Sequence, residues 1–168
     1  MTVNLYTFVG MYSRLLDTAA HILAKGAEHA QATGVSEADM LEWRLIDDMF
    51  PLRNQIQAVA NFAGQWPARA AGVEMLPTLE GPQRVAELQA ALAAAKAHLA
   101  GLRPEQFEGR DDVALTVDLG QMSPTFGAGQ WLTGFSTTNF YFHLSIAYAI
   151  LRSKGVQIGK RDLFAGGL

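Results

Sequence analysis

Four long segments of the chain repeat their apolar residues with the period of an α-helix. In each, apolar side chains recur every three or four positions and so line one face of the helix. The segments that show this pattern are residues 4–25, 48–71, 82–102 and 139–155. Gly26 and Gly72 follow the first two segments and are predicted to end those helices. Because each apolar face needs a partner to bury it, the pattern predicts a mainly all-α protein built as a four-helix bundle.

The fourth segment differs from the others because apolar positions cover more than half of its circumference. Asn139 and His143 nevertheless lie near the middle of this apolar arc, one turn apart. A buried polar pair costs free energy unless it is hydrogen-bonded or bound to a ligand. The pair therefore marks a candidate site, although it does not indicate a reaction.

A second period appears between the third and fourth helices. Apolar and more polar residues alternate there, as they do in a half-buried strand. The alternating apolar residues are Val113, Leu115, Val117 and Leu119. The prolines and glycines that follow predict an irregular segment with Trp131 packed inside it. The sequence thus predicts a long crossover that contains a short strand or hairpin.

The composition is that of a folded globular chain and excludes several classes of protein. With 168 residues, 49% of them hydrophobic and 17% charged, the chain suits one domain that spans residues 1–168. A net charge of −3 without a basic run argues against a nucleic-acid partner. The lack of cysteine excludes disulfides, thiolate metal ligands and a cysteine nucleophile. No apolar run reaches the length of a membrane span and no signal peptide is evident, so we expect a cytoplasmic protein without a membrane partner.

Two carboxylates near the helices have candidate roles. Asp48 is positioned to be the N-cap of the second helix, or to point inward near the end of the bundle, where Gln55 falls on the same face. Asp17 and His21 are four residues apart on the polar side of the first helix and are predicted to pair with each other.

The less apolar side of the fourth helix carries a second group of polar side chains. Tyr141, Ser145, Tyr148 and Arg152 fall together there. Aromatic residues and arginine are typical of protein interfaces, so this side is a candidate homodimer interface. Contact with the apolar tail, residues 156–164, is the alternative, because we expect that tail to fold back onto the bundle.

Several short stretches of the sequence resemble a known family. They are Asp48-Met49 with Pro51-Leu52 and Gln55, then Asn139-Phe-Tyr-Phe-His143, Ala147-Tyr-Ala-Ile-Leu-Arg152, and Gly155-Val-Gln-Ile-Gly-Lys160 with Asp162. The chain resembles the bacterial family catalogued as domain of unknown function 1993, in the DinB/YfiT-like superfamily of four-helix bundles. The resemblance covers nearly the whole chain and is most specific over residues 139–162.

The resemblance implies a divalent metal site made by three histidines, of which this chain retains one. His143 matches the second histidine of the fourth-helix pair, Asn139 takes the place of the first, and Asp48 is the nearest candidate for the second-helix ligand. Such a set would hold a hard divalent ion weakly. The alternative is a metal-free cluster in which Asn139, His143, Asp48 and Gln55 hydrogen-bond to one another. A carboxylate beside His143 would raise its pKa.

Two classes of function follow. One is a metal-dependent enzyme of the thiol-transferase or isomerase kind, as characterised members of the superfamily imply. The other, which we favour, is a small-molecule-binding or structural protein, expected as a homodimer, without an assigned reaction. In either case Leu52, Gln55 and Ile146 are the predicted pocket lining, and the catalytic residues are unknown.

Overall fold

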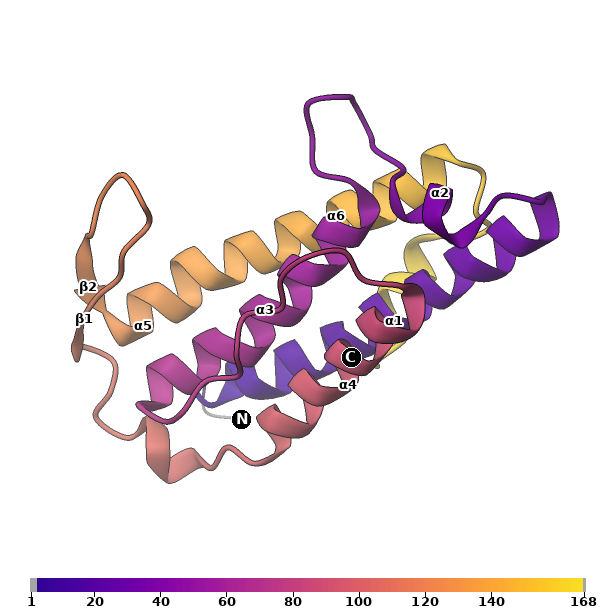
Figure 1. Ribbon diagram of the computed structural model, residues 1–168. Helices are drawn as coiled ribbons and strands as arrows, with labels where there is room; N and C mark the ends of the chain where they lie inside the picture. The colour runs from indigo at the N-terminus through magenta and orange to yellow at the C-terminus, as the bar shows by residue number, and fades with distance from the viewer. Residues whose placement is uncertain (1–2, 168) are drawn as a thin grey trace.

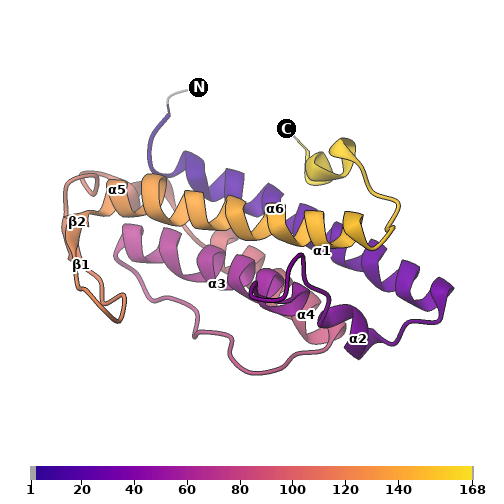
Figure 2. The same ribbon diagram turned by 90° about the horizontal axis from the view of Figure 1, so that it is seen from above.

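Four long helices pack side by side in the computed structural model, which describes residues 3–167; the first and last run in one direction and the two between them in the other (Figures 1 and 2). They are α1 (Thr7–Thr33), α3 (Leu52–Ala71), α4 (Val85–Ala100) and α6 (Thr137–Ser153). The core between them contains large side chains with no more than 2% exposure, among them Tyr12, Ile22, Leu52, Ile56, Leu88, Leu92 and Phe140. The predicted all-α, four-helix architecture is therefore confirmed. Within residues 3–167, none of the helices is both long enough and apolar enough to cross a membrane.

Short elements connect the long helices. They are α2 (Glu37–Leu41), a 3-10 turn at Pro104–Phe107, β1 (Ala114–Thr116), β2 (Thr125–Gly127), α5 (Ala128–Gln130), a π-helical turn at Trp131–Ser136 and a 3-10 turn at Lys160–Phe164. β1 and β2 form an antiparallel hairpin in which Leu115 is opposite Phe126. The hairpin stands at one end of the bundle (Figure 1), which confirms the predicted crossover.

The first helix is longer than the sequence predicts. It passes through Gly26 without interruption and ends at Thr33, where Gly34 adopts the left-handed conformation with φ 73°. Gly26 is buried, and a Cβ placed on it would be 2.6 Å from Cδ2 of Leu151 on α6. The glycine thus provides room for a helix–helix contact. Its predicted role as a helix stop is wrong, whereas Gly72 does end α3, with φ 74°.

The fourth helix starts earlier than predicted. The chain is helical from Ala128 onward and enters α6 through the π-helical turn, so the predicted irregular segment is wrong at this end. Trp131 is 2% exposed, and its indole N–H donates to the Leu115 carbonyl over 2.8 Å. Tyr12 of α1 lies 2.6 Å from Ser136 Oγ and so links α1 to the last residue of the turn. Burial raises the pKa of Tyr12 to about 12.

The C-terminal strap, which we define as residues 156–167, folds back across the bundle as predicted. Figure 2 shows it returning from the end of α6 to lie beside α1. Gly155 makes the turn possible because it has φ 89°. Val156 and Ile158 are 1% and 3% exposed and anchor the strap to the core.

Candidate functional site

One buried amide connects the start of α3 to His143 on α6. Gln55 is 1% exposed and its Nε2 donates to the Phe50 carbonyl over 2.9 Å. Its Oε1 lies 2.8 Å from His143 Nδ1. The residue of the second long helix that contacts His143 is therefore Gln55, and the predicted hydrogen bond between these two side chains is present.

This geometry fixes the tautomer of the imidazole. The Phe50 carbonyl can only accept a hydrogen bond, so the NH2 group of Gln55 must face it and the amide oxygen must face His143. His143 Nδ1 therefore carries a hydrogen and donates it to Gln55. In the neutral ring the lone pair is then on Nε2, which has no hydrogen-bond partner among residues 3–167 and is not one of their buried unpaired atoms.

Aromatic rings flank His143 on two sides. The ring of Phe62 from α3 stacks on it with centroids 5.9 Å apart, and Phe142 contacts it edge-on at 5.3 Å. Phe142 is 52% exposed. Burial lowers the pKa of His143. The expected carboxylate neighbour would have raised that pKa, but an uncharged amide is found in its place.

Asn139 does not join this cluster. Its Nδ2 donates to the Phe135 carbonyl one turn earlier, over 2.8 Å, and the side chain is partly buried. The amide thus satisfies a backbone group next to the π-helical turn, and the predicted direct bond to His143 is not found among the hydrogen bonds of the described chain.

Asp48 lies outside the cluster as well. It is exposed in the loop before α3, which begins at Leu52 with Pro51 as its N-cap. Its side chain takes part in none of the hydrogen bonds or ion pairs formed among residues 3–167. Both predicted roles of Asp48, as N-cap and as inward carboxylate, are therefore wrong, because Pro51 delays the start of the helix.

These positions do not fit the implied metal site. Of the three candidate ligands, His143 has a ring nitrogen without a partner among residues 3–167, Asn139 donates only its Nδ2 to a backbone carbonyl, and Asp48 is exposed in the loop before α3. Across residues 3–167, no three His, Cys, Asp or Glu side chains are grouped as metal ligands would be. A divalent ion needs about three good protein ligands for tight binding. Asp48 does not supply the third, and an asparagine amide is a poor ligand for a transition metal.

The predicted pocket residues are divided between core and site. Leu52 is fully buried in the core at 0% exposure, and Gln55 contacts His143 directly. Ile146 is half-buried and packs against the core, one turn after His143 on α6.

The side of α6 proposed as a dimer interface is partly used inside the chain. Arg152 Nη1 donates to the Ile158 carbonyl over 2.7 Å, and Tyr148 packs against the core. Tyr141 and Ser145 line a cavity beside the C-terminal strap. The alternative prediction, that this side of the helix contacts the tail, is thus confirmed for Arg152. The homodimer stays a prediction.

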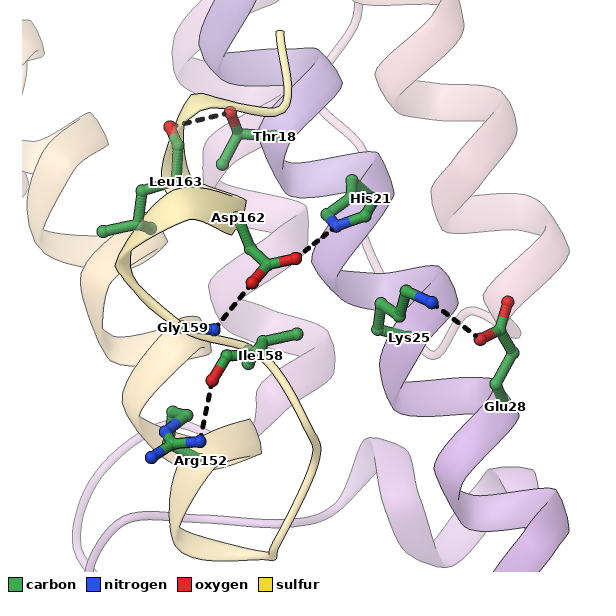
Figure 3. Close-up of polar contacts among 9 residues, drawn as sticks. All are labelled: Thr18, His21, Lys25, Glu28, Arg152, Ile158, Gly159, Asp162 and Leu163. Carbon is green, nitrogen blue, oxygen red and sulfur yellow. Dashed lines mark hydrogen bonds and ion pairs between the residues drawn. The ribbon is translucent and has the colours of Figure 1, made fainter.

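The strap brings together a polar cluster that the sequence pattern does not predict (Figure 3). Asp162 Oδ1 lies 2.7 Å from His21 Nε2, and Thr18 donates to the Leu163 carbonyl over 3.1 Å. The predicted pairing of His21 with Asp17 is wrong, since Asp17 binds Lys96 at 2.6 Å. The hydrogen bond from His21 lowers the pKa of Asp162, and the Gly159 N–H adds to the effect.

Comparison with known proteins defines the class. The chain shares its fold with the crystal structure of a DinB family member protein from Shewanella denitrificans, with a TM-score of 0.80 and 27% sequence identity over 96% of this chain and 95% of that one. It is thus a DinB-like helical bundle. The model of the family described as domain of unknown function DUF1993 matches residues 5–164, and the chain belongs to that family. No curated protein matches its sequence.

Proposed function

We propose that this DinB-like protein binds a small ligand at His143, and that it does so without a transition metal. The observation that carries the proposal is the hydrogen bond from His143 Nδ1 to Gln55, which leaves Nε2 as an unused acceptor. An acceptor of this kind pairs with an O–H, N–H or S–H donor of a ligand. The rings of Phe62 and Phe142 next to it favour a ligand with an apolar or aromatic body.

The chemistry around His143 favours binding over catalysis. A general base works best when its pKa is near the working pH, and a carboxylate partner is the usual means of raising the pKa of an imidazole. Gln55 brings no charge, and burial lowers the pKa of His143. The ring is therefore neutral at neutral pH and serves as a fixed hydrogen-bond acceptor. The metal-dependent enzyme is the second candidate, favoured only by the free Nε2 atom.

Metal content separates these two candidates. Plasma mass spectrometry would be applied to untagged protein purified without chelator, for wild type and His143→Ala. We expect far less than stoichiometric metal in both samples. Near-stoichiometric metal in the wild type, lost in His143→Ala, would contradict the proposal and establish the enzyme hypothesis as the better one.

Ligand binding can be tested with phenol and toluene, which differ by the one O–H donor. The signal is the His143 Cε1–H resonance in NMR spectra. We expect phenol to shift it saturably and to bind about tenfold tighter than toluene, because only phenol donates to Nε2. The ring resonances of Phe62, which stacks on His143, serve as the signal for the variants, because His143→Ala lacks the imidazole. His143→Ala should abolish that preference, whereas His29→Ala, a change at another partly exposed histidine, should preserve it. Equal affinity of wild type for both probes would refute the proposal.

A further inference from the structure

A cavity lies on the other side of α6, away from His143. Its volume is about 390 Å³, within the range of sites for small organic ligands. Tyr141 and Ser145 line it, each two positions from His143. Residues two apart on a helix point about 200° away from each other. The cavity is therefore separate from the His143 site and opens along the seam of α1 and α6.

The walls of this cavity are mostly apolar. Met11 and Leu15 of α1 and Leu144 of α6 form the helical wall, and Leu163 and Phe164 of the C-terminal strap form the facing wall. Leu144 is 2% exposed, while Phe164 is 49% exposed although it is large and apolar. An apolar body placed between these walls would remove their surface from water, which is favourable.

Of the four polar side chains that line the cavity, Thr18 is paired with the Leu163 carbonyl and the other three have no partner among residues 3–167. Arg14, Tyr141 and Ser145 line it, and none of their side chains forms a hydrogen bond or an ion pair with another residue among 3–167. Within residues 3–167, the carboxylate of Asp17 on α1 binds Lys96 and that of Asp162 on the strap binds His21 rather than Arg14. The cavity thus combines an apolar interior with one cation and two hydroxyl groups that are unpaired within residues 3–167.

The strap is held closely enough to α1 to act as a fixed wall. Asp162 binds His21, and Thr18 binds the Leu163 carbonyl (Figure 3). Gly166 then comes so close to α1 that a Cβ on it would collide with the Arg14 carbonyl oxygen at 2.1 Å. These contacts position Leu163 and Phe164 opposite the helices and place Gly166 beside the Arg14 backbone.

We propose that this cavity binds a small amphipathic monocarboxylate, with its apolar chain between the strap and the helices and its carboxylate on Arg14 and Tyr141. A guanidinium can bind a carboxylate through two parallel N–H donors, and a phenol O–H adds a third. Carboxylate is favoured over phosphate because one free cation matches one negative charge. The site is independent of the His143 site, so either proposal can fail alone.

The experiment compares octanoate with octanamide, which has the same chain and an uncharged head. Binding is followed through the 13C-methyl resonance of Met11, a lining residue. We expect octanoate to shift this signal saturably and to bind about tenfold tighter than octanamide, the size of effect that a charge-assisted hydrogen bond provides. Equal affinities, or no saturable shift of Met11 with octanoate, would overturn the proposal.

Two variants test whether the charge of Arg14 binds the carboxylate of octanoate. Arg14→Met keeps an apolar stem but removes the cation, and should reduce octanoate affinity about tenfold while leaving octanamide affinity unchanged. Arg161→Met removes the same charge from an exposed position on the strap that does not line the cavity, and should bind octanoate as the wild type does. Equal losses in both variants would show that only general charge attraction is at work and would overturn the site. Arg14 is exposed, so the folded state should tolerate its replacement.

Discussion

The amide of Gln55 donates to the Phe50 carbonyl and accepts from His143 Nδ1, so a single side chain holds both the start of α3 and the imidazole of α6. In a 1%-exposed position neither contact can be replaced readily by water. This relationship determines which ring nitrogen of His143 carries the hydrogen, and because Gln55 is uncharged it does not oppose the burial that lowers the pKa of His143.

Replacing that amide with a carboxylate should reverse the shift. In Gln55→Glu, we expect the pKa of His143 to rise above the usual histidine value of about 6.5, because a negative charge at hydrogen-bond distance stabilises the imidazolium. An NMR titration of the His143 Cε1–H signal measures this pKa. Gln57→Glu is the matched control, since Gln57 is also buried on α3 but binds the Leu79 carbonyl. A His143 pKa unchanged in Gln55→Glu would contradict the contact.

The lowered pKa of His143 should make stability depend on pH. Below the usual value of 6.5 the unfolded chain takes up a proton that the folded ring resists, so stability rises with pH in this window. The contribution is complete above about pH 6.5 and is lost as the pH falls through the lower folded-state pKa. Urea unfolding at about pH 7.5 and about pH 5.5 should therefore show a larger loss for wild type than for His143→Gln. Equal losses in the two proteins would contradict the assignment.

The strap should loosen when Asp162 loses its charge. In Asp162→Asn, hydrogen exchange at residues 156–167 is expected to be up to about tenfold faster, because the charge-assisted bond from His21 is weakened. Asp17→Asn is the control, since Asp17 is on α1, as His21 is, but binds Lys96. Equally fast exchange in both variants would argue against a specific role of the Asp162–His21 bond in holding the strap.

Acid should release the same strap in the wild type. The folded-state pKa of Asp162 is lowered, so its stabilisation is complete above the ordinary value of 3.8 and is lost as the pH falls through the lower folded-state pKa. The strap exchange of Asp162→Asn should be less sensitive to pH over that acidic window.

The long helices could be predicted from the sequence because a period of 3.6 residues is a local property of the chain. The candidate site could not be predicted in this way, because it depends on contacts between residues far apart in the chain. Whether Asp48 or Gln55 meets His143 is decided by where α3 starts, and Pro51 moves that start to Leu52. The pair of His21 and Asp162 joins residues 141 positions apart, so a neighbour such as Asp17 was the only partner that helical spacing could indicate.

The role of Gly26 could not be predicted for the same reason, since it depends on Leu151, far along the chain. Gly26→Ala would favour the helix by up to about 1 kcal/mol through propensity, but overpacking costs about 1–3 kcal/mol. Because Leu151 is 0% exposed, it has little room to move away from the new methyl group. We therefore expect a net loss of about 1 kcal/mol in the free energy of unfolding.

Gly10→Ala provides the matched comparison on the same helix. Gly10 is exposed and its Cβ would meet only Arg14 Nη1 at 3.5 Å, so this variant should gain up to about 1 kcal/mol. In a Leu151→Ala background, the space is restored and Gly26→Ala should become neutral or stabilising, a coupling that a double-mutant cycle of urea unfolding measures. If Gly26→Ala stabilised the wild type as much as Gly10→Ala does, the contact with Leu151 could not be the reason for a glycine at position 26.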